Sequence, residues 1–278
     1  MARFAVVQVT ATEDRQKNLQ IATELVRRSA GEGAEVVCLP EMWPFVGADS
    51  AKIAGAETLD GPSMTAMREL AADLGVWILP GSFAEVSDTP GRVYNTSPVY
   101  DPRGELRAVY RKLHLFDVDV PGGAVFKESD TVTAGDQAVV VDTEVGRLGL
   151  SICYDLRFPA LYQSLREGGA EVILVPAAFT AHTGKAHWEV LLRARAIEQQ
   201  VWIVAANQGG RHNPKRESHG HSMIIDPWGL VVARASEGPG IAVANLDLAQ
   251  VERVRREIPC GQNQRKWKGP GTPEGLDS

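Results

Sequence analysis

Three residues that could carry out acyl-transfer chemistry each follow an apolar run with the character of a β-strand. They are Glu41, Lys112 and Cys153. In sheets built from alternating strands and helices, ligand sites gather at the carboxyl ends of the strands. We therefore expect a carboxylate, a cation and a thiol at strand exits, where they could share one site.

A cysteine nucleophile needs a base to remove its proton and a cation to favour the thiolate. Glu41 could accept the Cys153 proton and later activate water. Lys112, with the backbone N–H of Tyr154, could stabilise an oxyanion. Taken one at a time, the same residue types are usually a solvated glutamate, a surface lysine and a buried thiol, and no local spacing ties them together.

The histidines offer a rival mechanism, in which Cys153 pairs with His114, His187, His219 or His221. Histidine is the usual partner of a catalytic cysteine. His219 and His221 alternate along the chain and would share one strand face, which also suggests a metal site. No third or fourth ligand stands at a recognisable spacing, so we expect neither a metal nor an organic cofactor.

The elements that must position these residues alternate between strand and helix patterns. The first half predicts strands at 3–9, 35–39 and 76–83, helices at 16–30 and from an N-cap at Ser63, and a hairpin of 93–100 and 106–110. The second half predicts strands at 147–152, 172–175 and 201–206, helices at 160–167 and 186–199, and a hairpin of 222–225 and 230–234.

The two halves share the positions of their turn residues and prolines as well as the order of their elements. Each hairpin turns at an Asp-Pro-x-Gly sequence, and Pro40 and Pro176 each follow the second strand of their half. This repeat predicts two quasi-twofold half-units. The expected fold is an α/β protein, an α-β-β-α sandwich of two sheets with helices on the outside.

We expect one domain over residues 1–260. A long irregular segment, 116–136, joins the halves, and loops of that length in compact proteins are often functional. Residues 261–278 contain little to bury, which predicts a loose tail or an arm ordered by a neighbouring subunit.

The composition limits the classes of molecule that the protein could bind. The 278 residues carry a formal charge of −6, which argues against binding to nucleic acid. No run approaches the roughly 20 apolar residues that span a membrane. Three cysteines at wide spacings fit neither a disulfide framework nor a zinc ribbon, and so indicate a reduced, cytoplasmic protein.

Three stretches resemble the signature blocks of the nitrilase superfamily of carbon–nitrogen hydrolases, in the order found in that family. They are "LPEMW", "YRKLHLFDVDVPGG" and "SICYDLRFP". The resemblance extends from residue 4 to about 256. It implies that Glu41 is the general base, Lys112 the electrostatic stabiliser and Cys153 the nucleophile. Glu128, in "FKESD", matches a second glutamate that orients the lysine or the substrate, although the residue type alone suggests an exposed loop carboxylate.

Two longer stretches, "GKAHWEVLLRARAIEQQ" and "GRHNPKRESHGHSMIIDPWG", resemble the branch whose members are deaminated glutathione amidases. The resemblance implies a small, anionic amide substrate and a homodimer or larger homo-oligomer. The ω-amidase branch, which acts on α-keto acid amides, shares "HLFDVDVPG" and "FKES" and stays an alternative. A nitrile hydrolase and a non-catalytic binding protein stay open as well.

Basic residues near these blocks could bind carboxylates. Arg157 follows Cys153 by four residues and could grip a substrate carboxylate in a bidentate fork, or pair with Asp155 or Glu128. Arg211, Lys215 and Arg216 form a basic loop that could hold distal carboxylates or stay solvated. The helix pattern over 160–165 predicts either a subunit interface or a cover for the sheet.

Overall fold

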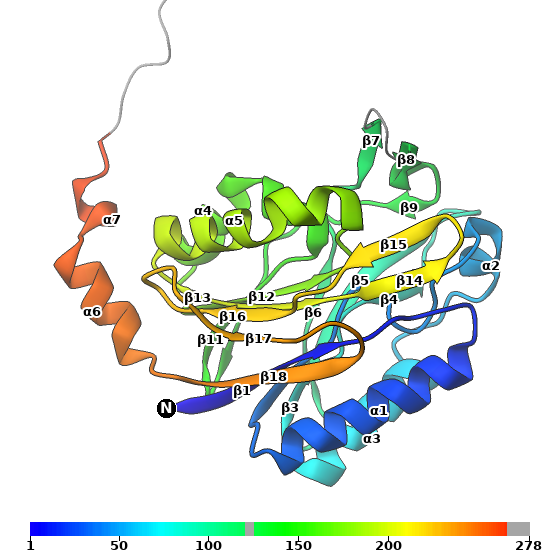
Figure 1. Cartoon of the computed structure of the whole chain (residues 1–278), viewed down its shortest axis with the longest axis horizontal. Coiled ribbons are helices and arrows are strands. Elements are labelled where there is room, and N and C mark those ends of the chain that lie inside the picture. The colour runs from blue at the N-terminus through cyan, green and yellow to red at the C-terminus, as the bar shows by residue number, and fades with distance from the viewer. Residues whose placement is uncertain (120–124, 266–278) are drawn as a thin grey trace, which may run out of the picture.

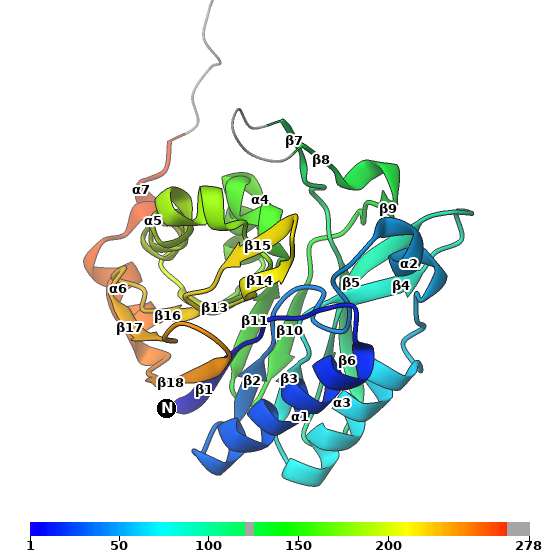
Figure 2. The same ribbon diagram turned by 45° about the vertical axis from the view of Figure 1, so that its right-hand side comes forward.

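Two β-sheets lie face to face and carry helices on their outer sides, as Figures 1 and 2 show. The computed structural model describes residues 1–119 and 125–265. The larger sheet runs in the order β18 (Gly240–Leu246), β1 (Ala2–Gln8), β2 (Val36–Cys38), β3 (Trp77–Leu79), β5 (Val93–Tyr100) and β4 (Phe83–Val86), with β6 (Leu106–Arg111) and β9 (Val132–Thr133) also pairing with β5. The second runs in the order β10 (Val140–Thr143), β11 (Gly146–Leu150), β12 (Val172–Ala177), β13 (Trp202–Asn207), β16 (Met223–Ile225) and β17 (Val231–Arg234).

Helices cover both outer faces. The helices α1 (Arg15–Gly31) and α3 (Pro62–Leu74) cover the larger sheet, and α4 (Pro159–Glu167) and α5 (Ala181–Gln199) cover the second (Figure 1). The predicted α-β-β-α sandwich is therefore confirmed. No helix in the two described ranges is long and apolar enough to cross a membrane.

The predicted repeat of the two halves is confirmed by the strand pairings. β1, β2 and β3 are parallel neighbours, and β5 lies antiparallel to β3. β11, β12 and β13 repeat this arrangement, with β16 antiparallel to β13. Both halves thus bring the carboxyl ends of their parallel strands to one edge of a sheet, where the sequence placed the reactive residues.

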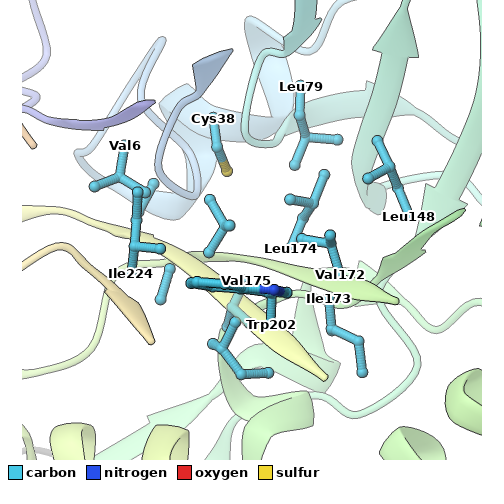
Figure 3. Packing of buried hydrophobic residues seen from close by; sticks show 14 of the residues in the cluster. Val6, Cys38, Leu79, Leu148, Val172, Ile173, Leu174, Val175, Trp202 and Ile224 are labelled. Carbon is cyan, nitrogen blue, oxygen red and sulfur yellow. The ribbon is translucent and has the colours of Figure 1, made fainter. Parts of the chain in front are cut away.

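Apolar side chains from both sheets fill the space between them. Figure 3 shows Val6, Cys38 and Leu79 of the larger sheet across from Leu174 and Ile224 of the second. A separate cluster lies beneath α1 and α3, where the helical spacing read from the sequence predicts the buried faces. The first cluster fixes the two sheets against each other and so sets the separation of the strand ends, and the second holds α1 and α3 on the larger sheet.

Two local predictions are wrong. Ser63 does not cap α3, because Gly61 is the N-cap and Pro62 begins the helix; both the N–H and the hydroxyl of Ser63 donate to Glu57 instead. The strand predicted at 76–83 ends at Leu79 and resumes at β4. Between them Gly81 has φ 62° and passes so close to Pro40 that a Cβ would overlap the Pro40 carbonyl oxygen. This contact braces the turn that precedes Glu41.

Short elements interrupt the long connections. The segment predicted as irregular, 116–136, contains β7 (Asp117–Asp119), β8 (Val125–Lys127), the 3-10 turn η1 (Glu128–Asp130) and β9; its residues 120–124 lie outside the described ranges. Further elements are α2 (Asp49–Ala54), η2 (Cys153–Arg157), the hairpin of β14 (Gly209–Asn213) and β15 (Arg216–His219), α6 (Ala249–Glu257) and α7 (Cys260–Asn263). α7 overlaps the start of the expected tail, whose residues 266–278 lie outside the described ranges.

Candidate active site

Glu41 lies three residues beyond β2 and is held from the opposite sheet. Its N–H donates to the carbonyl oxygen of Ala177 at 3.3 Å, and its Oε2 accepts the Ala178 N–H at 2.9 Å. The Gln208 side-chain amide donates to the Glu41 carbonyl oxygen at 3.1 Å. Since the side chain is only 5% exposed, these contacts leave the carboxylate little freedom to move.

Lys112 directly follows β6, and its side chain is 2% exposed. Its Nζ donates to Glu41 Oε1 at 2.9 Å and to Glu128 Oε2 at 2.9 Å. Burial alone would lower the pKa of Lys112, but the carboxylates of Glu128 and Glu41 outweigh burial and raise that pKa well above its ordinary value. Lys112 is therefore a permanent buried cation.

Cys153 begins the turn η2 and does not end a strand, because β11 stops at Leu150. Its φ of 48° lies in the left-handed region, which costs a non-glycine residue on the order of 1–3 kcal/mol. The turn is held by Asp155, whose Oδ2 accepts the Ile152 N–H at 2.8 Å. Strained residues of this kind cluster at functional sites, and here the strain turns the thiol toward the cavity that Glu41 and Lys112 line.

The Cys153 thiol is 8% exposed, and its pKa is raised well above its ordinary value. Burial is the main cause, and the negative charge of Glu41 adds to it; Lys112 opposes both. The thiol therefore stays neutral until a base removes its proton. A reaction at this sulfur needs a base close to it, and Glu41 lines the same cavity and hydrogen-bonds with the thiol.

Glu128 belongs to the same cluster and is not an exposed loop carboxylate. Its side chain is 15% exposed, and its Oε2 accepts the Phe116 N–H at 2.6 Å. Asn95, on β5, joins the two glutamates, because its Nδ2 donates to Glu41 Oε1 at 2.8 Å and to Glu128 Oε1 at 3.3 Å. Asn95 was not predicted from the sequence, although a polar residue in an otherwise buried strand is an indication of a functional site.

Arg157 lies at the end of η2 and lines the cavity. Its Nη1 is 3.3 Å from His187 Nδ1, and its guanidinium lies 5.1 Å from the centre of the Phe179 ring. It forms no ion pair with Asp155 or Glu128 within the residues that the structure describes. The structural ion-pair alternative is therefore wrong, and the guanidinium is available to a ligand.

The four candidate histidine partners do not line the cavity. His114 Nδ1 lies 2.7 Å from Asp155 Oδ1, and its ring stacks on Phe158. The rings of His219 and His221 contact each other at 4.7 Å between centroids. Across the described ranges, no group of three or more potential ligands could hold a metal ion. The Cys–His alternative therefore has no partner for Cys153 among these four.

The cavity has a volume of about 380 Å³, within the range of small-molecule sites. Glu41, Lys112 and Cys153 form its buried floor. Aromatic side chains line its walls, namely Phe45, Phe116, Phe126, Tyr154 and Phe179. Lys215 and Arg216 of the predicted basic loop also line it, and Arg211 does not. The site thus offers a nucleophile, a base and a cation at the base of an apolar pocket with basic residues at its rim.

This combination of sandwich fold, buried lysine between two carboxylates and strained cysteine defines a class of hydrolases. The carbon–nitrogen hydrolase family model matches residues 3–256, and the chain belongs to that family. This confirms the resemblance to the nitrilase superfamily.

Curated relatives and solved structures agree with this assignment. The chain is 44% identical over 266 residues to the human deaminated glutathione amidase, covering 94% of this chain and 81% of that protein. It is 44% identical to a deaminated glutathione amidase of Synechocystis sp. (strain PCC 6803 / GT-S), covering 94% of this chain and 97% of that protein. Its fold matches the crystal structure of the Caenorhabditis elegans NitFhit protein with a TM-score of 0.88 and 43% identity, covering 95% of this chain and 66% of that one.

Proposed function

We propose that this chain hydrolyses the amide bond of deaminated glutathione through a thioester on Cys153. The observation that carries the proposal is the contact of Lys112 with both Glu41 and Glu128 beneath the cavity that Cys153 lines. The substrate is inferred from the relatives at 44% identity, which are named for that activity.

In the first step, Cys153 Sγ attacks the amide carbonyl carbon while Glu41 accepts the thiol proton. The Lys112 ammonium and the Tyr154 N–H stabilise the oxyanion of the tetrahedral intermediate. Glu41 then returns the proton to the amide nitrogen, and the carbon–nitrogen bond breaks. Cysteinylglycine leaves as the free amine, and the acyl group stays on sulfur as a thioester.

In the second step, water attacks the thioester carbonyl carbon and Glu41 accepts a proton from that water. The same two donors stabilise the second oxyanion. The intermediate collapses, the carbon–sulfur bond breaks, and the thiolate takes the proton back from Glu41. The product is 2-oxoglutarate, and Glu128 keeps Lys112 in position through both steps.

Arg157 is suited to the keto-acid carboxylate of this substrate. A guanidinium binds a carboxylate through two parallel N–H groups, and here it is held by His187 and lies over the Phe179 ring. The side chain is half-buried, so an ion pair there is screened less than one at the surface.

Turnover of three substrates separates this proposal from its alternatives. Deaminated glutathione should give 2-oxoglutarate with a higher kcat/KM than α-ketoglutaramate or a nitrile. A preference for α-ketoglutaramate would instead indicate an ω-amidase, and release of acid from the nitrile alone would indicate a nitrilase. No turnover of any of the three would favour a binding protein.

The same assay tests the nucleophile. Cys153→Ala should abolish turnover, because neither of the other two cysteines, Cys38 and Cys260, lines the cavity. Cys260→Ala is the matched control, since Cys260 is a free, exposed cysteine on α7 and does not line the cavity. Turnover that survives in Cys153→Ala would contradict the proposal.

We also infer a homo-oligomer, as the resemblance implies. The apolar face of α4 covers the sheet, because Leu161, Tyr162 and Leu165 are buried. Exposed apolar side chains lie instead on α5, in the β16–β17 turn and on β17, namely Val190, Ile197, Trp228, Leu230 and Val232. Light scattering on the purified protein should give at least twice the 30.1 kDa chain mass.

A further inference from the structure

The rim of the cavity carries more positive than negative charge. Asp49, at the start of α2, lies 3.0 Å from Lys52 Nζ and 3.8 Å from Arg216 Nη2 through the same oxygen. The second distance is too long for a hydrogen bond. Lys215 also lines the cavity and forms no ion pair with any residue of the described ranges. Lys52 and Arg216 therefore share one carboxylate, and Lys215 has none within the described residues.

The other carboxylate at this rim does not correct the imbalance. Glu217 lies 3.7 Å from Arg211, whose side chain is 71% exposed and does not line the cavity. Lys52 is already held by Asp49 and by Thr131 Oγ1 at 2.9 Å. Among the described residues, two free cations of the rim, Lys215 and Arg216, thus come from the β14–β15 hairpin, and a third, Lys127, comes from β8.

The hairpin that carries these two cations is fixed in place. Asn213 Oδ1 accepts the N–H groups of Lys215 at 2.9 Å and of Arg216 at 3.0 Å, which sets the turn between β14 and β15. The His212 ring anchors the hairpin through the Ala11 carbonyl oxygen at 2.7 Å and Ser218 Oγ at 2.8 Å. A preorganised hairpin loses little entropy when it binds an anion.

Arg157 and the hairpin cations are separate cationic groups of the cavity. Arg157 belongs to the nucleophile turn, whereas Lys215 and Arg216 come from the rim hairpin. A substrate with one carboxylate needs only one of them. The substrate of the proposed function has two, one in the keto-acid part and one at the glycine end of the leaving dipeptide.

We propose that Lys215 and Arg216 form a second anion subsite, which binds the terminal carboxylate of the leaving dipeptide. This inference rests on the proposed function. Asp49, 3.8 Å away, is a loose partner of Arg216 that a substrate carboxylate could replace. The subsite makes the enzyme bind a long, doubly charged amide more tightly than a short amide that releases ammonia.

The subsite is tested by comparing two substrates on the native protein and on a double variant. The substrates are deaminated glutathione and its analogue with a carboxamide in place of the glycine carboxylate, and 2-oxoglutarate release is measured for both. The native protein should favour the carboxylate by about tenfold in kcat/KM, mainly through KM. In the double variant Lys215→Ala/Arg216→Ala the ratio should fall to about one, because the carboxylate no longer has a cation to pair with.

Arg211→Ala is the matched control, because Arg211 is a cation of the same hairpin that does not line the cavity. It should keep the native ratio. A native protein that is active but shows no preference, or a double variant that keeps the preference, would overturn the subsite alone. A native protein that hydrolyses neither substrate would overturn the proposed function and the subsite with it.

Discussion

Lys112 is a buried cation that is paired with two carboxylates, Glu41 and Glu128. This pairing fixes the charge of the lysine and its position in the site. Taking charges out of water is expensive, and the cost is offset only where the geometry is good and every hydrogen bond is made. The Lys112 ammonium donates to Glu41 and Glu128, and Asn95 donates to both carboxylates. The result is a rigid set of charges that needs no rearrangement when an oxyanion forms.

Replacing Glu128 tests the role of the second carboxylate. Glu128→Gln removes the largest favourable charge acting on Lys112, so the pKa of Lys112 should fall. A lysine with a lowered pKa loses its proton earlier as pH rises, so the alkaline limb of the kcat profile should move to lower pH. We expect kcat itself to fall, but by less than the roughly 100- to 1,000-fold that follows the loss of an oxyanion donor, because Lys112 is still present.

Asp130→Asn is the control for that experiment, because Asp130 lies on the same turn η1 and is exposed. Its pH profile should overlay that of the native protein. A Glu128→Gln profile that falls in height without moving along the pH axis would mean that Glu128 does not act through the charge of Lys112.

The sequence predicted the residues that the structure brings together at the cavity, but not all of the residues that hold them in place. Glu41, Lys112 and Cys153 were found because they follow strands and because the blocks around them resemble a family. Asn95 and Gln208 were not, since their contacts with Glu41 join segments 54 and 167 residues apart along the chain. Such contacts depend on how the two sheets stack, which no local pattern encodes.

At the scale of elements, Asp155 ties the lysine segment to the nucleophile turn. Its carboxylate is fully buried and accepts the Tyr110 hydroxyl at 2.6 Å and the Ile152 N–H at 2.8 Å. It also accepts the His114 N–H at 3.0 Å. Since Tyr110 and His114 flank Lys112, this one carboxylate sets where β6 lies relative to η2.

Tyr110→Phe tests this connection. The change leaves the buried Asp155 short of a donor, which should lower the free energy of unfolding by about 1–3 kcal/mol in denaturant titrations. The control is Tyr94→Phe, because the Tyr94 hydroxyl donates to Asp88 at the surface and its loss should cost less than about 0.5 kcal/mol. Equal effects of the two changes would rule out a special role for the Asp155 connection.

The regular elements were predictable where periodicity and turns agreed. Both hairpins with Asp-Pro-x-Gly turns lie where the sequence placed them. The predicted strand at 76–83 broke because Gly81 turns the chain past Pro40, a contact made in three dimensions. The β14–β15 hairpin was not predicted as strands, since its charged sequence lacks the alternation of a half-buried strand.

At the scale of the whole molecule, the core between the sheets holds the two halves of the site together. Leu174 of β12 is fully buried in that core (Figure 3). Leu174→Ala should lower the free energy of unfolding by about 2–5 kcal/mol, because it removes buried contacts and leaves a cavity. Leu106→Ala, at a position 45% exposed, should change it by less than about 0.5 kcal/mol. Similar losses in the two variants would contradict this description of the core.

The stability of the fold should also depend on His219. Burial, and then the neighbouring His221, lower the pKa of His219 to about 4. A histidine whose pKa is lower in the folded state stabilises the fold above its unfolded pKa of about 6.5, and that contribution is lost as pH falls from 6.5 toward 4. The free energy of unfolding should therefore decrease over this window. His219→Gln should flatten the decrease, and an unchanged slope in that variant would contradict the prediction.

The most direct test of the central claim is mass spectrometry of the protein quenched during turnover of deaminated glutathione. We expect an added 2-oxoglutaryl group, bound as a thioester to the peptide that contains Cys153. The adduct should be absent in Cys153→Ala. An adduct on any other residue, or undiminished release of 2-oxoglutarate by Cys153→Ala, would contradict a Cys153 thioester mechanism.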